Sequence, residues 1–166
     1  MSLPEGSGPY ALGPDDGEAL WFNGALGILR ATAAQTDGRF AAFELRLRGG
    51  FGAPLHSHEN DYEFFIVLSG EFRLRHGDNI VEAGPGSLLY TPPGVGHSFT
   101  ADSDDARMLL FFGPAGPEEF FRAVATPARS LTFPPPDEPV PSREELVEIM
   151  KRHGQTLLGP PLPPKE

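Results

Sequence analysis

The chain has 166 residues, the size of one ordinary domain, and it is long enough to bury a hydrophobic core. Thirteen Lys and Arg against 23 Asp and Glu give a net charge of −10, which excludes nucleic acids and anionic membranes as expected partners. The sequence has no cysteine, so disulfides and thiolate chemistry are excluded, and any metal must be held by nitrogen and oxygen atoms.

The first residues of the chain mix glycine, proline and acidic residues with little periodicity, which predicts an extended arm over residues 1–18. No apolar run of signal-peptide length follows Met1. We therefore expect a cytoplasmic protein.

Short apolar runs separated by turn-forming residues dominate the chain from residue 20 to residue 112. The run Phe40–Leu47 alternates apolar and polar residues with period two, which is typical of a strand with one wet face. The pattern predicts an all-β sandwich or barrel rather than a parallel α/β sheet. The predicted strands are Leu20–Phe22, Gly27–Ala33, Phe40–Leu47, Tyr62–Leu68, Glu71–Arg75, Asn79–Glu82, Ser87–Thr91, His97–Ala101 and Arg107–Phe112.

Two helices are expected after the strands. Pro117 suits a first helical position, which predicts a short helix to about Val124. Ser142 and Glu145 form a capping box, and Gly154 fits the end of a C-terminal helix. The expected organisation is therefore an arm at 1–18, a barrel with its short helix at 19–126, and a proline-rich connector, C-terminal helix and tail at 127–166.

Three histidines and one glutamate stand at positions suited to a metal site. His56 and His58 are two apart, so on a strand both imidazoles share one face. A His-x-His pair alone is more often a solvent-exposed strand face than a site. Here Glu63 starts the next run and His97 opens a later strand after a Pro-Pro-Gly turn. Three imidazoles and one carboxylate suit one divalent transition metal, namely Fe, Mn, Ni, Co, Cu or Zn, better than Ca or Mg.

The spacing of these residues forms two motifs. The pattern G-x5-H-x-H-x4-E-x6-G is met by Gly50, His56, His58, Glu63 and Gly70. The pattern G-x5-P-x-G-x2-H is met by Gly86, Pro92, Gly94 and His97. Together the two motifs resemble those of the cupin superfamily, although Ala101 stands where the second motif usually continues to an asparagine that is not a ligand.

Three longer stretches narrow the resemblance. Glu63–Gly70, Pro92–Phe99 and Gly113–Phe121 look like the single-domain, quercetin 2,3-dioxygenase-like cupins. The resemblance implies a double-stranded β-helix, or jelly-roll barrel, with a metal inside it. It also implies that the metal ligands are His56, His58, Glu63 and His97.

Four protein ligands leave up to two positions open on an octahedral metal, so an ionised substrate oxygen and O2 can bind side by side. The resemblance implies a dioxygenase that acts on a flavonol-like or other aromatic enol or catechol substrate. Glu63 is the candidate catalytic base for the substrate hydroxyl. Strand alternation points four apolar side chains inward, where they either line a substrate pocket or simply fill the barrel core: Phe43, Leu45, Phe65 and Phe99.

A non-oxidative role is the alternative, either as a metal-dependent isomerase or lyase or as a small-molecule-binding module without turnover. A sugar-phosphate isomerase would need Lys or Arg in the cavity. The arginines near the motifs are predicted to face outward, which weakens that version: Arg46, Arg48, Arg73 and Arg75.

Two strands are apolar at every position, Phe64–Leu68 and Met108–Phe112, so both of their faces should be covered. The terminal arms or a second subunit must provide this cover. We expect a homodimer.

Overall fold

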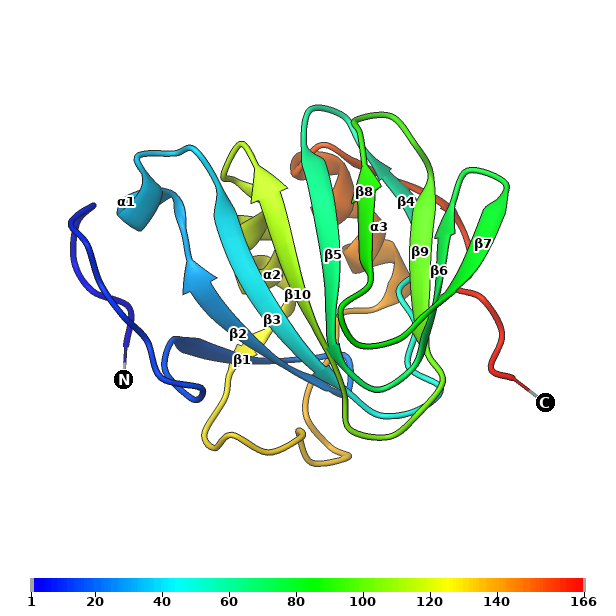
Figure 1. Cartoon of the computed structure of the whole chain (residues 1–166), viewed down its shortest axis with the longest axis horizontal. Coiled ribbons are helices and arrows are strands. Elements are labelled where there is room, and N and C mark those ends of the chain that lie inside the picture. The colour runs from blue at the N-terminus through cyan, green and yellow to red at the C-terminus, as the bar shows by residue number, and fades with distance from the viewer. Residues whose placement is uncertain (1, 166) are drawn as a thin grey trace.

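Two antiparallel β-sheets connected by tight turns make up most of the structure (Figure 1). The computed structural model describes residues 2–165. The strands are β1 (Glu18–Phe22), β2 (Ala25–Ala31), β3 (Ala41–Leu47), β4 (Leu55–His58), β5 (Tyr62–Ser69), β6 (Phe72–His76), β7 (Asn79–Ala83), β8 (Leu88–Thr91), β9 (His97–Ala101), β10 (Ala106–Gly113), β11 (Thr126–Pro127) and β12 (Gln155–Gly159). The helices are α1 (Ala33–Thr36), α2 (Pro117–Val124) and α3 (Arg143–Arg152).

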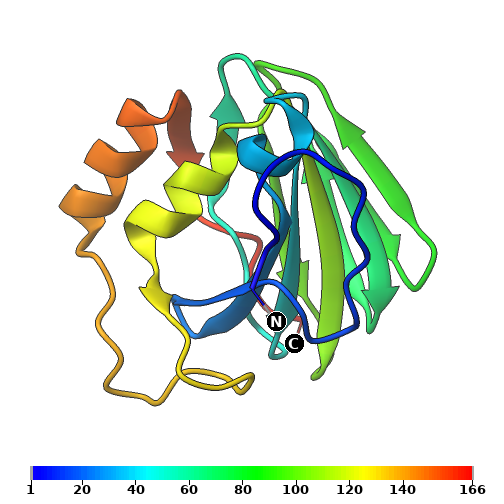
Figure 2. The ribbon, with the colours of Figure 1, turned by 90° about the vertical axis from the view of Figure 1, so that its left-hand side faces the viewer.

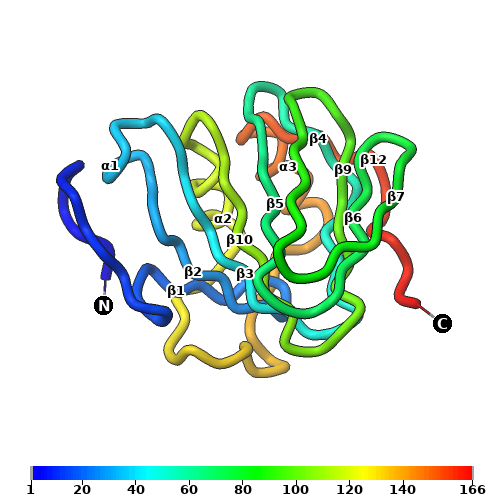
Figure 3. Tube along the Cα trace, in the orientation of Figure 1, coloured from blue at the N-terminus to red at the C-terminus, as the bar shows by residue number. Residues whose placement is uncertain are grey.

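The chain crosses repeatedly between the two sheets, as the trace in Figure 3 shows. The seven-stranded sheet has the order β11-β1-β2-β3-β10-β5-β8, and the five-stranded sheet has the order β12-β4-β9-β6-β7. From β3 to β6, successive strands alternate between the sheets, and they do so again from β7 to β10. This crossing pattern is that of a jelly roll, so the predicted all-β jelly-roll class is confirmed.

Alternation along β5 places one face of this strand in the core. In β5, Phe65 and Val67 are each 1% exposed, whereas Phe64 and Ile66 on the other face are half-buried. Burial of these apolar side chains supplies the main driving force for closing the two sheets. Glu63 occupies an inward position of the same strand, so the fold buries a carboxylate among apolar side chains.

Helices α2 and α3 cover one side of the barrel and lie beside the sheets in Figure 2. The predicted capping box of α3 is present: the Glu145 amide donates to the Ser142 hydroxyl at 3.2 Å, and the Ser142 amide donates to the Glu145 carboxylate at 2.8 Å. Phe121 of α2 and Met150 of α3 join the main hydrophobic core. These helices therefore close the barrel on the side where the sheets open.

The sequence pattern does not predict β4, β11, β12 or α1. β4 has four residues and β11 has two, which is too short for a period to show. β12 lies in the expected tail, and its pairing depends on β4 rather than on its own pattern. The predicted strand Gly27–Ala33 ends early, at Ala31, because Thr32 caps α1.

The N-terminal arm lies against β2 and β3. The Tyr10 hydroxyl donates a hydrogen bond to the Arg30 carbonyl at 2.8 Å. The guanidinium of Arg46 forms an ion pair with Asp15 at 2.9 Å. Among the residues that the structure describes, none of the helices combines the length and the apolar character needed to cross a bilayer.

Candidate metal centre

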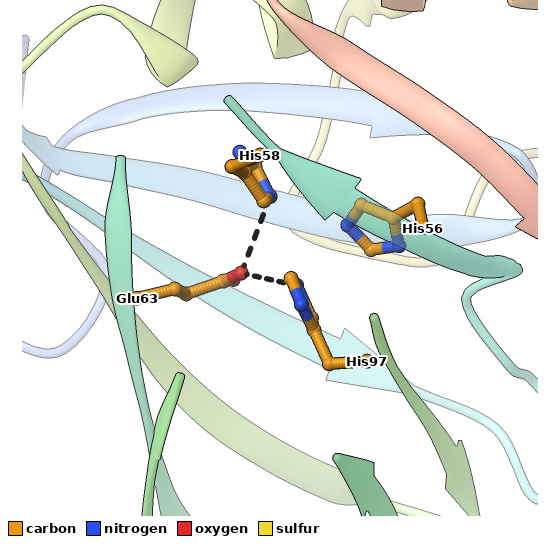
Figure 4. A group of neighbouring side chains, drawn as sticks. All are labelled: His56, His58, Glu63 and His97. Atoms are coloured by element: carbon orange, nitrogen blue, oxygen red, sulfur yellow. Dashed lines mark hydrogen bonds and ion pairs between the residues drawn. The ribbon is translucent and has the colours of Figure 1, made fainter. Parts of the chain in front are cut away.

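Three histidines and one glutamate converge inside the barrel (Figure 4). His56 and His58 lie on β4, and His97 begins the neighbouring strand β9, where it pairs directly with His56. Glu63 lies on β5 of the facing sheet. One ligand atom from each side chain lies within 4.8 Å of those of the other three. The motif spacing thus brings all four side chains to one point.

Tight turns aim these side chains at each other. The turn over residues 59–61 carries the chain from the smaller sheet to the larger one, so Glu63 approaches from the opposite wall. The turn before His97 contains Gly94, whose φ of 78° favours glycine. The Gly94 amide donates a hydrogen bond to the His58 carbonyl at 2.7 Å. This bond ties the second motif to the first.

The carboxylate of Glu63 lies at the centre of the cluster. It is 2.9 Å from Nε2 of His97 and 3.4 Å from Nε2 of His58. The 3.4 Å separation is an ion-pair distance rather than a well-formed hydrogen bond. The rings of His56 and His97 have centroids 4.4 Å apart. One possible ligand atom of each group therefore lies close enough to the other three for the four side chains to share one ion.

Backbone carbonyls fix the orientation of two imidazoles. Nδ1 of His56 is 2.8 Å from the carbonyl of Pro54, and Nδ1 of His97 is 3.0 Å from the carbonyl of Val95. Because a carbonyl only accepts, each Nδ1 carries the hydrogen and donates it. Each Nε2 is then left to face the cluster, which is the arrangement of metal-ligating histidines.

A carboxylate takes the place of the carbonyl at the third imidazole. Nδ1 of His58 lies 3.5 Å from Oδ2 of Asp61, in the turn after β4. Neither ring nitrogen of this buried histidine has a hydrogen-bond partner among the described residues. Because Nδ1 faces Asp61, it is Nε2, on the side of the cluster, that is available to a partner other than the protein.

Burial and mutual charge set the protonation of the cluster. Burial, reinforced by the neighbouring histidines His97 and His58, lowers the pKa of His56 to about 3. Burial opposes charge on His58 as well, but Asp61 and Glu63 outweigh it and raise the pKa of His58 to about 9. Burial alone would raise the pKa of Glu63, yet its contacts with His58 and His97 lower it to about 2. A buried carboxylate in the charged state is poised to accept a cation.

The chemistry of the donor set fits a divalent transition metal. Three ring nitrogens and one carboxylate oxygen form a borderline site, and three of the four side chains are buried (His58, Glu63 and His97). Hard cations such as Ca²⁺ and Mg²⁺ prefer sites made of oxygen. The cluster is therefore compatible with a transition-metal site in the barrel.

An apolar cavity of about 130 Å³ adjoins the cluster. Its walls include His56, His58 and Glu63 at one end, together with Leu45, Phe65 and Phe99. Residues of α2 and α3 and residues 140–141 of the connector also line it. Within the described chain, no lysine or arginine lines this cavity. An anionic substrate would find no cation here apart from a metal.

Phe43 does not line the cavity, which corrects one expectation. The residue is fully buried, and its ring packs against that of Phe121 with centroids 4.1 Å apart and the ring planes tilted by 34°. The ring also occupies the space above Gly27, where an added Cβ would lie 2.1 Å from it. Phe43 therefore belongs to the barrel core, because α2 covers it from the cavity side.

Several cavity residues have no signal in the strand pattern. Phe120 and Phe121 come from α2, and Met150 comes from α3. Gln155 comes from β12. Helical spacing identifies an apolar stripe on α2 but does not reveal what the stripe covers. The position of Gln155 follows from the pairing of β12 with β4, which no local pattern signals.

Fold and cluster together define an all-β jelly-roll protein whose barrel holds a candidate metal site. The family model described as Cupin domain matches residues 43–112, which include all four cluster residues. The chain belongs to the cupin superfamily.

Curated relatives and solved structures agree with this assignment. Quercetin 2,3-dioxygenase of Bacillus subtilis is 30% identical over 132 residues, which cover 80% of this chain and 39% of the enzyme. The chain therefore spans about two fifths of that enzyme's length. An uncharacterized protein of Streptomyces coelicolor is 37% identical over 99 residues, covering 54% of this chain and 92% of that protein. Oxalate decarboxylase of Bacillus subtilis superposes with a TM-score of 0.54 at 25% identity, over 60% of this chain and 27% of the enzyme.

Proposed function

We propose that this protein is a metal-dependent dioxygenase that acts on a flavonol-like or other aromatic enol or catechol substrate with O2. The observation that carries the proposal is that the His/Glu cluster adjoins a partly enclosed cavity lined by aromatic side chains, with no cationic side chain among the described lining residues. Similarity to a quercetin 2,3-dioxygenase supports the same reaction class. The proposal extends only to the class of substrate.

His56, His58, Glu63 and His97 would hold one divalent transition metal through three Nε2 atoms and one carboxylate oxygen. When bound, such a metal would act as a Lewis acid that favours the ionised form of a substrate hydroxyl, and any of the redox-active metals would also supply redox chemistry with O2. The donor set allows Fe, Mn, Ni, Co, Cu or Zn.

Glu63 is the proposed proton acceptor. It is the one carboxylate in the cavity lining within the described residues, and it is 3% exposed. A substrate hydroxyl directed at the cluster lies within reach of its free oxygen, so the carboxylate takes the hydroxyl proton. The loss of that proton raises the electron density of the aromatic ring, which favours its attack by O2.

The aromatic walls orient the substrate and exclude water. Phe65 and Phe99 lie beside the cluster, with ring centroids 6.0 Å apart in an edge-to-face arrangement. Such rings bind a planar aromatic ligand through apolar contact. Exclusion of water protects reactive species from hydrolysis and strengthens the charge interactions at Glu63.

O2 consumption with quercetin and with catechol tests this proposal. Protein loaded separately with Fe, Mn, Ni, Co or Cu should consume O2 with at least one metal, and both oxygen atoms of ¹⁸O2 should appear in the products. Product formed without O2 uptake would instead support the isomerase or lyase alternative. Binding without product would support the binding module. Either outcome would overturn the dioxygenase proposal.

We also propose that the protein is a homodimer formed through the outer face of β5 and β8. This face is apolar, and β8 lies at the edge of its sheet. It comprises Tyr62, Phe64, Ile66, Leu68, Leu88 and Tyr90. Two copies of a chain with a net charge of −10 repel each other, so an uncharged face is the favourable place for contact.

Sedimentation analysis of two matched variants tests this arrangement. Leu88 is 58% exposed on β8, and Leu88→Lys should convert the dimer to a monomer. Val81 is 41% exposed on β7, outside the proposed interface, and Val81→Lys should remain dimeric. A native protein that sediments as a monomer would contradict the proposal.

A further inference from the structure

The cavity wall contains one buried polar side chain that does not belong to the cluster. Gln155 is the first residue of β12 and is 6% exposed. It pairs directly with His58 across the β12–β4 ladder. Directly paired residues of antiparallel strands place their side chains on the same face of the sheet. The carboxamide of Gln155 therefore lies on the inner face, one strand away from the cluster.

This carboxamide has no hydrogen-bond partner among residues 2–165, although it lines the cavity. A glutamine side chain offers two N–H donors and one carbonyl acceptor. Neither of its polar atoms is among the fully enclosed atoms without a partner, so both remain accessible to a ligand in the cavity. A ligand in the cavity would supply the missing partner.

The fold holds this residue in place from both sides. α3 ends just before β12, and Gly154 makes the turn between them with a φ of 67°. The Glu59 amide donates a hydrogen bond to the Gly154 carbonyl at 2.8 Å, which fixes the start of β12 to the end of β4. Gln155 is therefore preorganised beside His58 before any ligand enters.

Few other polar side chains line the cavity and could hydrogen-bond a ligand. Apart from the cluster, the lining is apolar except for Gln155 and Asn23, and Asn23 is an exposed residue of the β1–β2 turn. A neutral amide recognises hydroxyl and carbonyl groups without favouring an anion. A buried site that pairs with such a group discriminates against analogues that lack it.

We propose that Gln155 is a specificity-determining residue that hydrogen-bonds a further, uncharged hydroxyl or carbonyl group of the substrate, next to the enol or catechol group directed at the metal. This inference rests on the proposed function, because it assumes an aromatic ligand whose first oxygen faces the cluster. The substrate class is thereby narrowed to small aromatic compounds that carry a further oxygen beside the coordinating group.

Catechol and pyrogallol form a matched pair of probes, since pyrogallol adds one neighbouring hydroxyl. Binding is measured by calorimetry to Zn-loaded protein under argon, so that neither redox chemistry nor turnover contributes. The native protein should bind pyrogallol about ten-fold more tightly than catechol, the range of one buried hydrogen bond. The variant Gln155→Leu should lose this preference by weakening pyrogallol alone.

Two controls separate recognition from structure. Thr156→Val alters the next, exposed residue of β12 and should keep the native preference. Because the Gln155 carboxamide has no protein partner, Gln155→Leu should retain the native melting temperature and zinc content. A lowered melting temperature with an unchanged preference for pyrogallol would show a structural role and overturn the inference.

The remaining outcomes are also decisive. Equal binding of the two probes by the native protein, or no binding of pyrogallol, would overturn the assignment of Gln155. These results are independent of the dioxygenase proposal, because O2 uptake is measured with redox-active metals. A selective pyrogallol site without O2 uptake would leave the role of Gln155 intact and remove the oxygenase.

Discussion

The carboxylate of Glu63 lies 2.9 Å from Nε2 of His97, although 34 residues separate them along the chain. The contact joins the two sheets, because Glu63 lies on β5 and His97 on β9. Both groups are almost completely buried, at 3% and 1% exposure. A charged carboxylate in such surroundings depends on a cationic neighbour, which is the His58 imidazolium without metal and a metal ion when one is bound.

Substitution of Glu63 should weaken both the fold and the proposed metal site. Glu63→Gln keeps the shape of the side chain but removes the charge, so the metal-free protein should lose about 1–3 kcal/mol of unfolding free energy. Bound metal should fall well below one ion per chain. Urea denaturation and metal analysis measure the two effects. Glu59→Gln, an exposed neighbour, should change neither, and equal behaviour of the two variants would contradict the role of Glu63.

Asp61 should tune the metal site through His58. Its carboxylate lies 3.5 Å from Nδ1 of His58 and supports the orientation and basicity of the ring. Asp61→Asn should therefore weaken metal binding about 10- to 100-fold without abolishing it. Competition with a chromophoric chelator measures the affinity. The matched control Asp78→Asn, in the exposed β6–β7 turn, should bind metal like the native protein.

The metal-free protein should be most stable near pH 6.5. The pKa of His56 is lowered to about 3, so the unfolded chain binds more protons below pH 6.5 and stability falls as the pH drops. The pKa of His58 is raised to about 9, so its contribution is fully present below pH 6.5 and is lost as the pH rises to 9. Each limb has a limiting slope of about 1.4 kcal/mol per pH unit.

Urea titrations with a chelator present, from pH 4.5 to pH 9, measure this profile. His56→Gln should flatten the acid limb, whereas His153→Gln, at the end of α3 and outside the cluster, should retain it. Bound metal replaces the proton on His58, so the loaded protein should lose the alkaline limb. A metal-free profile that rises steadily from pH 6.5 to pH 9 would be inconsistent with the pKa of His58.

Filling the cavity should block ligands but spare the metal. Ala53 lines the cavity, and Ala53→Trp would occupy the space beside the cluster. We expect catechol binding to fall at least about ten-fold while metal content stays native. Calorimetry and metal analysis give the two readouts. Ala34→Trp, on the exposed surface of α1, is the size-matched control, and equal loss in both variants would place the binding site elsewhere.

The sequence predicts the parts of this molecule that rest on local pattern and fixed spacing. The alternation in β3 and β5 determines which side chains face inward. The spacing of the two motifs identifies the four residues of the cluster, which are His56, His58, Glu63 and His97. The alternation of side chains along β3 does not distinguish the core residue Phe43 from the cavity residue Leu45, because both side chains point inward. Only the position of α2 distinguishes them.

The cover of the cavity is the least predictable part. The capping box predicts helix α3, but the sequence of the helix does not indicate that Met150 lines a cavity. The strand β12 follows a turn at Gly154 and carries no alternation strong enough to identify it. Its register with β4, which places Gln155 beside His58, arises from backbone pairing between segments about a hundred residues apart.

An anomalous difference map from crystals of protein purified without added metal would show directly whether the three histidines and Glu63 bind one metal ion. We expect one peak inside the barrel, about 2.0–2.3 Å from Nε2 of His56, His58 and His97 and from one oxygen of Glu63. No peak within the barrel, or a metal bound by other residues, would contradict it.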